Sequence, residues 1–326
     1  MSCPFSTSTL SSTSISPHWV TGFCDRAARF GITPHFRQSN GKWGVNIAFE
    51  ILCDIQHIET LKLLQVFFGV GKIFTTASTA TYRVTKIGEI LSVIVPHFTQ
   101  YPLISTKWIQ YTLWVQCVNL MKSGQHNSLP GLQSLLSIYA AMNRGPSSTV
   151  LQHFPNLVPV SLPVYTRMFT ELHPWWVTGY CTLWASFSAK LSTKYIPSNN
   201  NPYFSLQHTF TLTRMVSEAV IMEALKEFFL ANLWLREDGS QYTLSVGNVM
   251  TLDQTVLTHF NEYPLPSSLA AQFAVWEEIV LIALCLRRSR RSETSGSRHS
   301  TNPNTSLEHV LPELEVLMKQ LNELKK

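Results

Sequence analysis

Two stretches of the chain alternate apolar and polar residues with a period of two, and a helical pattern follows each of them. The first stretch spans residues 42–51, and its apolar positions are Trp43, Val45, Ile47, Phe49 and Ile51. The second spans residues 204–213, and its apolar positions are Phe204, Leu206, Phe210 and Leu212. A period of two places alternate side chains on opposite faces of a β-strand. The sequence therefore predicts two sheets, each with one apolar and one polar face.

The elements that follow these strands come in the same order in both halves of the chain. Apolar residues recur at helical spacing over residues 58–68, where Gly69 and Gly71 end the pattern, and over residues 218–230. Short strands are expected at residues 72–76, 81–86, 232–236 and 242–246. Each half is predicted to form a helix, two strands, a helix, two strands and further helices. Because a sheet must cover its apolar face, we expect the helices on that side and an open polar face.

Short motifs also recur along the chain. The segment WVTGFC at residues 19–24 returns as WVTGYC at 176–181, and HFTQYPL at 97–103 returns as HFNEYPL at 259–265. Both repeats are roughly 160 residues apart, and the pair Phe67–Phe68 returns as Phe228–Phe229 between them. Ordered matches at one offset indicate a duplicated unit. The predicted fold class is α+β, with tandem αββαββα units related by pseudo-two-fold symmetry.

The duplication divides the chain into segments. We expect a disordered tail at residues 1–16, a first unit at 17–153, a linker at 154–172, a second unit at 173–286, a basic disordered loop at 287–305 and an amphipathic helix at 306–326. The Ser/Thr-rich tail has neither the arginines of a transit peptide nor the apolar core of a secretion signal. The basic segment 287–291 either binds phosphate backbone or is a solvated basic loop.

Composition narrows the classes of function. A chain of 326 residues with 45% hydrophobic residues is large enough for two units with their own cores. Its net charge of +5 fits an anionic partner without a polybasic coat. The six cysteines form no CxxC pair and no zinc spacing, so the sequence predicts a reducing compartment and no structural metal. No uncharged apolar run reaches membrane-spanning length, because the nearest, residues 273–286, is short and carries Glu277 and Glu278.

The polar faces of the two predicted sheets carry basic and amide side chains and few acids. Such side chains contact phosphates and base edges, although an ordinary solvated sheet face would show the same pattern. Trp234, on a predicted strand, is a candidate for stacking on a base. The candidate nucleic-acid-binding residues are Arg29, His35, Arg37, Lys42, Asn46, Lys72 and Arg83 in the first unit, and Lys190, Lys194, Gln207 and Arg236 in the second.

These ordered motifs resemble the LAGLIDADG homing endonucleases and maturases of fungal and other organellar introns, whose single-chain members have the same tandem organisation. Segments 19–25 and 176–181 look like the two signature helices, segments 67–74 and 82–85 look like the central strand pair, and 96–103 with Lys107 resembles the helical end of the first unit. The resemblance implies curved antiparallel sheets that form a saddle-shaped groove backed by helices. It also implies that Gly22 and Gly179 lie where the signature helices pack together.

In that family, each signature helix ends in an acid that holds divalent metal ions for phosphodiester cleavage. The usual pattern Gly-Phe-x-Asp-x-Glu-Gly aligns with residues 22–28, so Ala27 stands at the first acid's position and Trp184 at the second. Asp25 is kept, but two positions back on a helix it points to a different side. Lys107 matches a basic residue that often supports catalysis, and its counterpart is Leu269. The resemblance therefore implies no catalytic acid and no metal site, with Mg²⁺ needed only if nuclease activity survives.

Three hypotheses about function remain open at this point. The first is a nucleic-acid-binding protein without nuclease activity, with RNA favoured over DNA: a group I intron maturase or a stabiliser of structured RNA, in a ribonucleoprotein such as an intron or the mitochondrial ribosome. The second is an intron-encoded DNA endonuclease with weak or residual activity. The third is a decayed intron reading frame, against which the intact core alternation argues. The resemblance further implies a mitochondrial protein, a monomer with an internal pseudo-dimer and no membrane partner.

Overall fold

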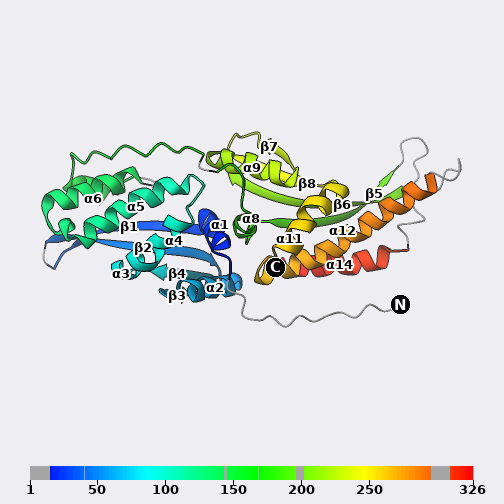
Figure 1. Ribbon diagram of the computed structural model, residues 1–326, viewed down its shortest axis with the longest axis horizontal. Helices are drawn as coiled ribbons and strands as arrows, with labels where there is room; N and C mark the ends of the chain where they lie inside the picture. The colour runs from blue at the N-terminus through cyan, green and yellow to red at the C-terminus, as the bar shows by residue number, and fades with distance from the viewer. Residues whose placement is uncertain are drawn as a thin grey trace.

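In the computed structural model, which describes residues 15–39, 41–142, 145–167, 169–195, 202–294 and 309–325, each half of the chain forms a four-stranded antiparallel sheet. The strand orders are β1-β2-β4-β3 and β5-β6-β8-β7, so the two halves share one topology. The two sheets lie side by side along the longest axis of the molecule (Figure 1). The predicted α+β fold with two αββαββα units is confirmed.

The elements of the two units correspond one to one from the first helix of each unit, through its four strands, to the short helices that follow the last strand. The first unit comprises α1 (Pro17–Ala27), β1 (Ala28–Arg37), β2 (Lys42–Asp54), α2 (Ile58–Phe68), β3 (Lys72–Thr75), β4 (Thr79–Val84), α3 (Ile87–Glu89), α4 (Val95–Gln100), α5 (Lys107–Lys122), α6 (Leu129–Ala141) and α7 (Ser148–His153). The second comprises α8 (Pro174–Cys181), β5 (Ser186–Tyr195), β6 (Pro202–Met215), α9 (Ala219–Phe229), β7 (Asn232–Leu235), β8 (Gln241–Val246), α10 (Val249–Thr251), α11 (Thr258–Glu262), α12 (Ser267–Thr294) and α14 (Leu311–Glu323).

The alternation of β2 decides which side of the first sheet is the core. Val45, Ile47, Phe49 and Ile51 are all buried, whereas the intervening side chains face away from the core, as a period of two requires. The helix that follows stops at Gly69, whose φ of 65° is the left-handed conformation that ends many helices. The polar–apolar pattern of this strand thus sets both the core and the open face.

Helices α1 and α8 lie against each other between the two sheets (Figure 1). A Cβ atom added to Gly22 would lie 2.0 Å from the carbonyl oxygen of Trp176, and one added to Gly179 would lie 2.0 Å from the carbonyl oxygen of Trp19. No side chain larger than a hydrogen atom fits at that distance, so the two helix backbones touch at these glycines.

Each of these central helices is tied to its own unit by the same buried hydrogen bonds. The Thr21 hydroxyl donates to the carbonyl oxygen of Tyr101 and lies 3.1 Å from Nε2 of His97. In the second unit, Thr178 makes the corresponding contacts with Tyr263 and His259, with the same 3.1 Å separation from Nε2. The repeated His-Phe-x-x-Tyr-Pro-Leu motif therefore anchors each central helix to the helix after its sheet.

The long helix α12 covers the apolar face of the second sheet. Its segment Leu269–Arg288 is long and apolar enough to cross a membrane by length and composition alone. In the structure, Trp276 and Ile279 are fully buried in the second core, and the Trp276 indole nitrogen donates to the carbonyl oxygen of Ser188 on β5 at 3.0 Å. The apolar character of this helix is therefore used in packing on the sheet.

The prediction of a disordered basic loop at residues 287–305 is wrong for its first part, because α12 continues to Thr294. Arginine is a good helix former, and positive charge is favourable at the C-terminal end of a helix. Arg288 also pairs with Asp253 at 3.8 Å. Residues 295–308 and the tail 1–14 lie outside the described residues. Helix α14 follows, and its Leu314, Leu317 and Leu321 are buried in the second core.

Candidate functional site

The register of the first sheet places its candidate residues on one face. Arg29 pairs with Glu50 across β1 and β2, and Glu50 in turn pairs with Arg83 on β4. Residues that face each other in an antiparallel ladder project to the same side. Following the pairs across all four strands puts Arg29, His35, Arg37, Lys42, Asn46, Arg83 and Lys72 on the face opposite the core.

Sequence reasoning missed one member of this open face, the half-buried acid Glu50. One carboxylate oxygen of Glu50 lies 2.6 Å from Nε of Arg83, and the other lies 4.0 Å from a guanidinium nitrogen of Arg29. The alternation of β2 already assigned Glu50 to the polar face, but it gave no reason to single this residue out. The carboxylate therefore lies between two arginines on an otherwise basic surface.

The open face of the second sheet is mainly uncharged. Lys190 pairs with Gln207 and Thr213 pairs with Thr243, so hydroxyl and amide groups line it. Trp234 lies on this face with 48% of its surface exposed. Arg236, just after β7, pairs with Asp238 at 3.4 Å. The residues on the face include Ser186, Ser188, Lys190, Ser192, Lys194, Ser205, Gln207, Thr209, Thr211, Thr213, Met215, Asn232, Trp234, Gln241, Thr243 and Ser245.

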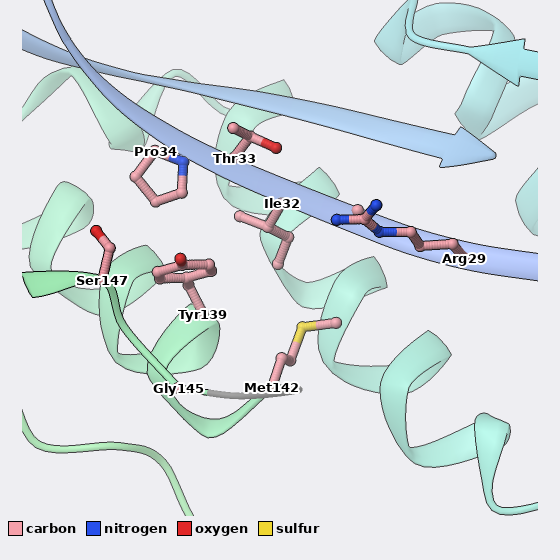
Figure 2. Close-up of a pocket in the computed structure, with 9 residues that line it drawn as sticks. Arg29, Ile32, Thr33, Pro34, Tyr139, Met142, Gly145 and Ser147 are labelled. Carbon is pink, nitrogen blue, oxygen red and sulfur yellow. The ribbon is translucent and has the colours of Figure 1, made fainter.

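A pocket lies along β1, the edge strand of the first sheet. Figure 2 shows Ile32 and Pro34 of β1 opposite Tyr139 of α6 and the segment that leads into α7. Arg29 projects beside the same pocket, at the end of the strand that adjoins α1. The helical end of the first unit therefore flanks the open face on this edge.

The two positions that the resemblance assigns to metal-binding acids lie where the central helices meet the sheets. Ala27 is the last residue of α1. Helix α8 ends earlier, at Cys181, and Leu183 then adopts a φ of 71°. This turn carries Trp184 across to the first unit, where it packs against that unit's core with its ring 5.7 Å from the ring of Phe23. Trp184 is thus part of the second unit in sequence and packs against the core of the first unit.

The guanidinium of Arg26 lies over the face of the Trp184 ring, 4.6 Å from its centroid. This is the geometry of a cation–π contact. Arg26 precedes Ala27, so the contact lies at the junction between α1 and the first sheet. Sequence reasoning missed Arg26, because nothing in the chain indicates that Trp184 crosses to it.

Asp25 is fully buried and its carboxylate is occupied by hydrogen bonds. One oxygen accepts from the backbone nitrogen of Ile104 at 3.0 Å and from the indole nitrogen of Trp176 at 2.8 Å, and the other accepts from the nitrogen and hydroxyl of Ser105. Burial raises the pKa of Asp25 to about 6, although these hydrogen bonds oppose the rise. The bond to Trp176 joins the two units, so Asp25 acts as a structural link.

Lys107 begins α5 and lies beside the end of α1. Its ammonium donates to the carbonyl oxygen of Ala28, and burial lowers its pKa. Its counterpart in the second unit, Leu269, is a buried apolar residue. The second unit therefore has no cation at the position that corresponds to Lys107.

A divalent metal ion does not fit the side chains at this junction. Ala27 and Trp184 offer no oxygen ligand, and hard cations require oxygen ligands. The carboxylate of Asp25 is saturated by donors, and Arg26 and Lys107 place positive charge nearby. Within the described residues, no group of three or more His, Cys, Asp or Glu side chains is arranged to hold a metal.

Part of the chain is similar to a known protein family. The profile described as LAGLIDADG endonuclease matches residues 20–118. A probable intron-encoded endonuclease 3 of Neurospora crassa is 25% identical over 254 residues, which cover 76% of this chain and 46% of that protein. Residues 20–118 are therefore similar to the LAGLIDADG endonuclease family, and relatives that match the chain are described as intron-encoded endonucleases. A probable intron-encoded DNA endonuclease 1 of Mycosarcoma maydis is 30% identical over 122 residues, or 37% of this chain and 44% of that protein. The chain spans about half the length of the curated relatives it matches.

Solved structures of LAGLIDADG proteins share the whole architecture. I-SmaMI, bound to an uncleaved DNA target in the presence of calcium ions, superposes with a TM-score of 0.80 at 23% identity, covering 94% of this chain and 99% of that one. I-LtrWI, bound to target DNA, has a TM-score of 0.76 at 23% identity and covers 82% of this chain and 90% of that one. At this identity the likeness establishes the fold.

Proposed function

We propose that this LAGLIDADG-like chain binds nucleic acid across its two open sheet faces and does not cleave it. One observation carries the proposal. The chain has an open, basic sheet face, but Ala27 and Trp184 stand at the two positions that the resemblance assigns to metal-binding acids. Phosphate contact and groove recognition need the basic and amide side chains of the faces. Cleavage by the family's route needs metal-holding carboxylates, which these two residues do not supply.

Two further features support the proposal. The solved relatives I-SmaMI and I-LtrWI are bound to DNA targets, and this chain has the same fold. In addition, both cores are filled by large side chains, with Phe49 and Phe210 fully buried at matching positions. Such packing favours a protein under selection for folding over a decayed reading frame.

Within this proposal we favour a structured RNA as the target, in the role of a group I intron maturase or of a ribosomal RNA stabiliser in the mitochondrion. A protein that assists RNA folding needs shape recognition and backbone contact, and neither requires a metal site. The test is to crosslink the protein in its own organelle and to sequence the attached nucleic acid. Intron RNA or ribosomal RNA would support the RNA role, whereas organellar DNA would overturn it and leave nucleic-acid binding intact.

The first prediction concerns the open face of the first sheet. Replacing Arg37, Lys42 and Arg83 together by alanine should weaken binding to duplex nucleic acid and flatten its salt dependence, because each removed phosphate contact lowers the slope by about 0.7–0.9. Fluorescence anisotropy over a range of KCl concentrations measures both quantities. A matched triple change on the helical side, Lys62, Lys122 and Lys226 to alanine, should leave the slope unchanged. Equal slopes in the two triple variants would remove the open face from the binding surface.

The absence of cleavage is tested separately. The protein is incubated with its crosslinked target, as DNA and as RNA, in Mg²⁺ or Mn²⁺, and the products are resolved on a denaturing gel. We expect intact strands. Metal-dependent double-strand cutting would show that the junction at Ala27 and Trp184 works with other ligands.

A further inference from the structure

The guanidinium of Arg26 has no acceptor for its buried donor. Its Nε atom is buried and has no hydrogen-bond partner. Its contact with the Trp184 ring is a cation–π contact, which satisfies no N–H group. No ion pair to Arg26 occurs in the part of the chain that the structure describes. The adjacent Asp25 does not serve, because its oxygens accept from Ile104, Ser105 and Trp176.

An unpaired, partly buried charge with an unsatisfied donor is costly to a folded protein. A strained backbone conformation nevertheless accompanies the contact of Arg26 with Trp184. Leu183 adopts a φ of 71°, which L residues with a side chain rarely do, and this turn positions Trp184 against Arg26 and Phe23. Strain of this kind is maintained where a side chain must be held in a fixed orientation.

The position of Arg26 is at the centre of the molecule. It lies one residue before Ala27, where α1 gives way to β1, and the next residue on the open face is Arg29. Trp184 lies just before β5, whose first residue Ser186 begins the open face of the second sheet. Helices α1 and α8 lie between the two sheets (Figure 1). A nucleic acid that contacted both faces would therefore pass this junction.

We propose that Arg26, supported on the ring of Trp184, is a metal-independent binding site for a phosphodiester of the nucleic-acid backbone. The inference rests on the proposed function and names the chemistry of its central contact. A guanidinium presents a planar fork of donors that matches two phosphate oxygens. The phosphate would accept from the terminal guanidinium nitrogens, while the buried Nε stays covered, and the indole face would keep the guanidinium from turning away. A positive side chain then lies one residue before Ala27, the position that the resemblance assigns to the first metal-binding acid.

The experiment compares Arg26→Ala with wild type on two fluorescein-labelled duplexes of arbitrary sequence, one of DNA and one of RNA. A backbone contact is independent of sequence, so these probes suffice. Anisotropy titrations over a range of KCl concentrations are run once in EDTA and once in Mg²⁺. Lys62→Ala serves as the control, because it removes one positive charge from an exposed position on α2, where Lys62 pairs with Glu59 at 2.6 Å.

We expect Arg26→Ala to weaken binding roughly tenfold and to lower the slope of log K against log [KCl] by about 0.9 on B-DNA. Lys62→Ala should change neither. Wild type should bind in EDTA without added Mg²⁺, and Mg²⁺ should not increase its affinity, because a divalent ion competes for the same phosphates. Arg26→Lys should keep most of the slope and lose part of the affinity, because an ammonium keeps the charge without the fork.

The outcomes separate this inference from the function on which it rests. If wild type binds both duplexes and Arg26→Ala retains the wild-type slope, the phosphate site is wrong and nucleic-acid binding stands. If wild type requires Mg²⁺ to bind, the site is not metal-independent and the proposal fails. If wild type binds neither duplex nor its crosslinked target, the proposed function fails and the phosphate site fails with it. Thermal melting of each variant shows whether a loss of affinity arises because the variant is unfolded.

Discussion

At the scale of single residues, part of the junction follows from the sequence and part does not. Ala27 and Trp184 can be identified by aligning short motifs, and their chemistry excludes oxygen ligation. The contact between Trp184 and Arg26 could not be foreseen, because it depends on the left-handed conformation of Leu183. No propensity assigns that conformation to a leucine.

The second prediction restores carboxylates at this junction. The double variant Ala27→Glu, Trp184→Glu should bind Mn²⁺ at least tenfold more tightly than wild type, because carboxylate oxygens are ligands that this ion accepts. Electron paramagnetic resonance of free Mn²⁺ measures the binding. The isosteric control is the double variant with glutamine at both positions, which has the same size and no charge. Equal Mn²⁺ binding by the two doubles would show that the two positions do not converge on one site.

At the scale of elements, the sequence predicted β2, α2 and the short strands well because their patterns are regular. The bounds of β1 were not derivable, since Gly31 and Pro34 interrupt its alternation. Proline is tolerated there because β1 is an edge strand. The basic end of α12 was predicted as loop from its composition, whereas its arginines extend the helix. Charge composition alone does not distinguish a solvated helix end from a loop.

The third prediction concerns the contact of α1 with α8. Gly22→Ala should lower the free energy of unfolding by about 3 kcal/mol, because a methyl group would overlap the backbone of Trp176 and force the helices apart. Gly88→Ala is the matched control: a Cβ at Gly88 meets open space, and alanine favours a helix by up to about 1 kcal/mol over glycine. Urea unfolding measures both. A Gly22→Ala variant as stable as wild type would mean that the helices can separate without loss.

At the scale of the whole molecule, three buried ionisable groups with large pKa shifts contribute to how stability varies with pH. Burial lowers the pKa of His97 and of His259 to about 4, so folding favours their neutral forms. Their contribution is present above the unfolded pKa near 6.5 and is lost as the pH falls towards 4. Burial raises the pKa of Asp25 to about 6, so its contribution has the opposite sign and grows as the pH falls from 6. The two histidines outweigh the single aspartate.

The fourth prediction follows from this balance. Between pH 7 and pH 4.5 these three groups together should lower the free energy of unfolding by roughly 3 kcal/mol, since a tenfold change in an acid dissociation constant on folding corresponds to about 1.4 kcal/mol. Urea unfolding at the two pH values measures the change. The double variant His97→Gln, His259→Gln should show a smaller decrease than wild type, because the two largest histidine contributions are removed while Asp25 remains. A decrease of the same size in the double variant would assign the acid sensitivity to other groups.

The unequal charge of the two sheets has a consequence for any bound strand. Arg29, Arg37 and Arg83 lie on the first face, whereas the second is lined mainly by serine, threonine and glutamine. On the proposed function, one half of a target is held chiefly by its phosphates and the other chiefly by neutral hydrogen bonds. Turning the target end for end would exchange these two environments. The two repeats share one architecture, yet their open faces differ in charge. We therefore expect a duplex to bind in one orientation, so that a palindromic target would gain no affinity from its symmetry.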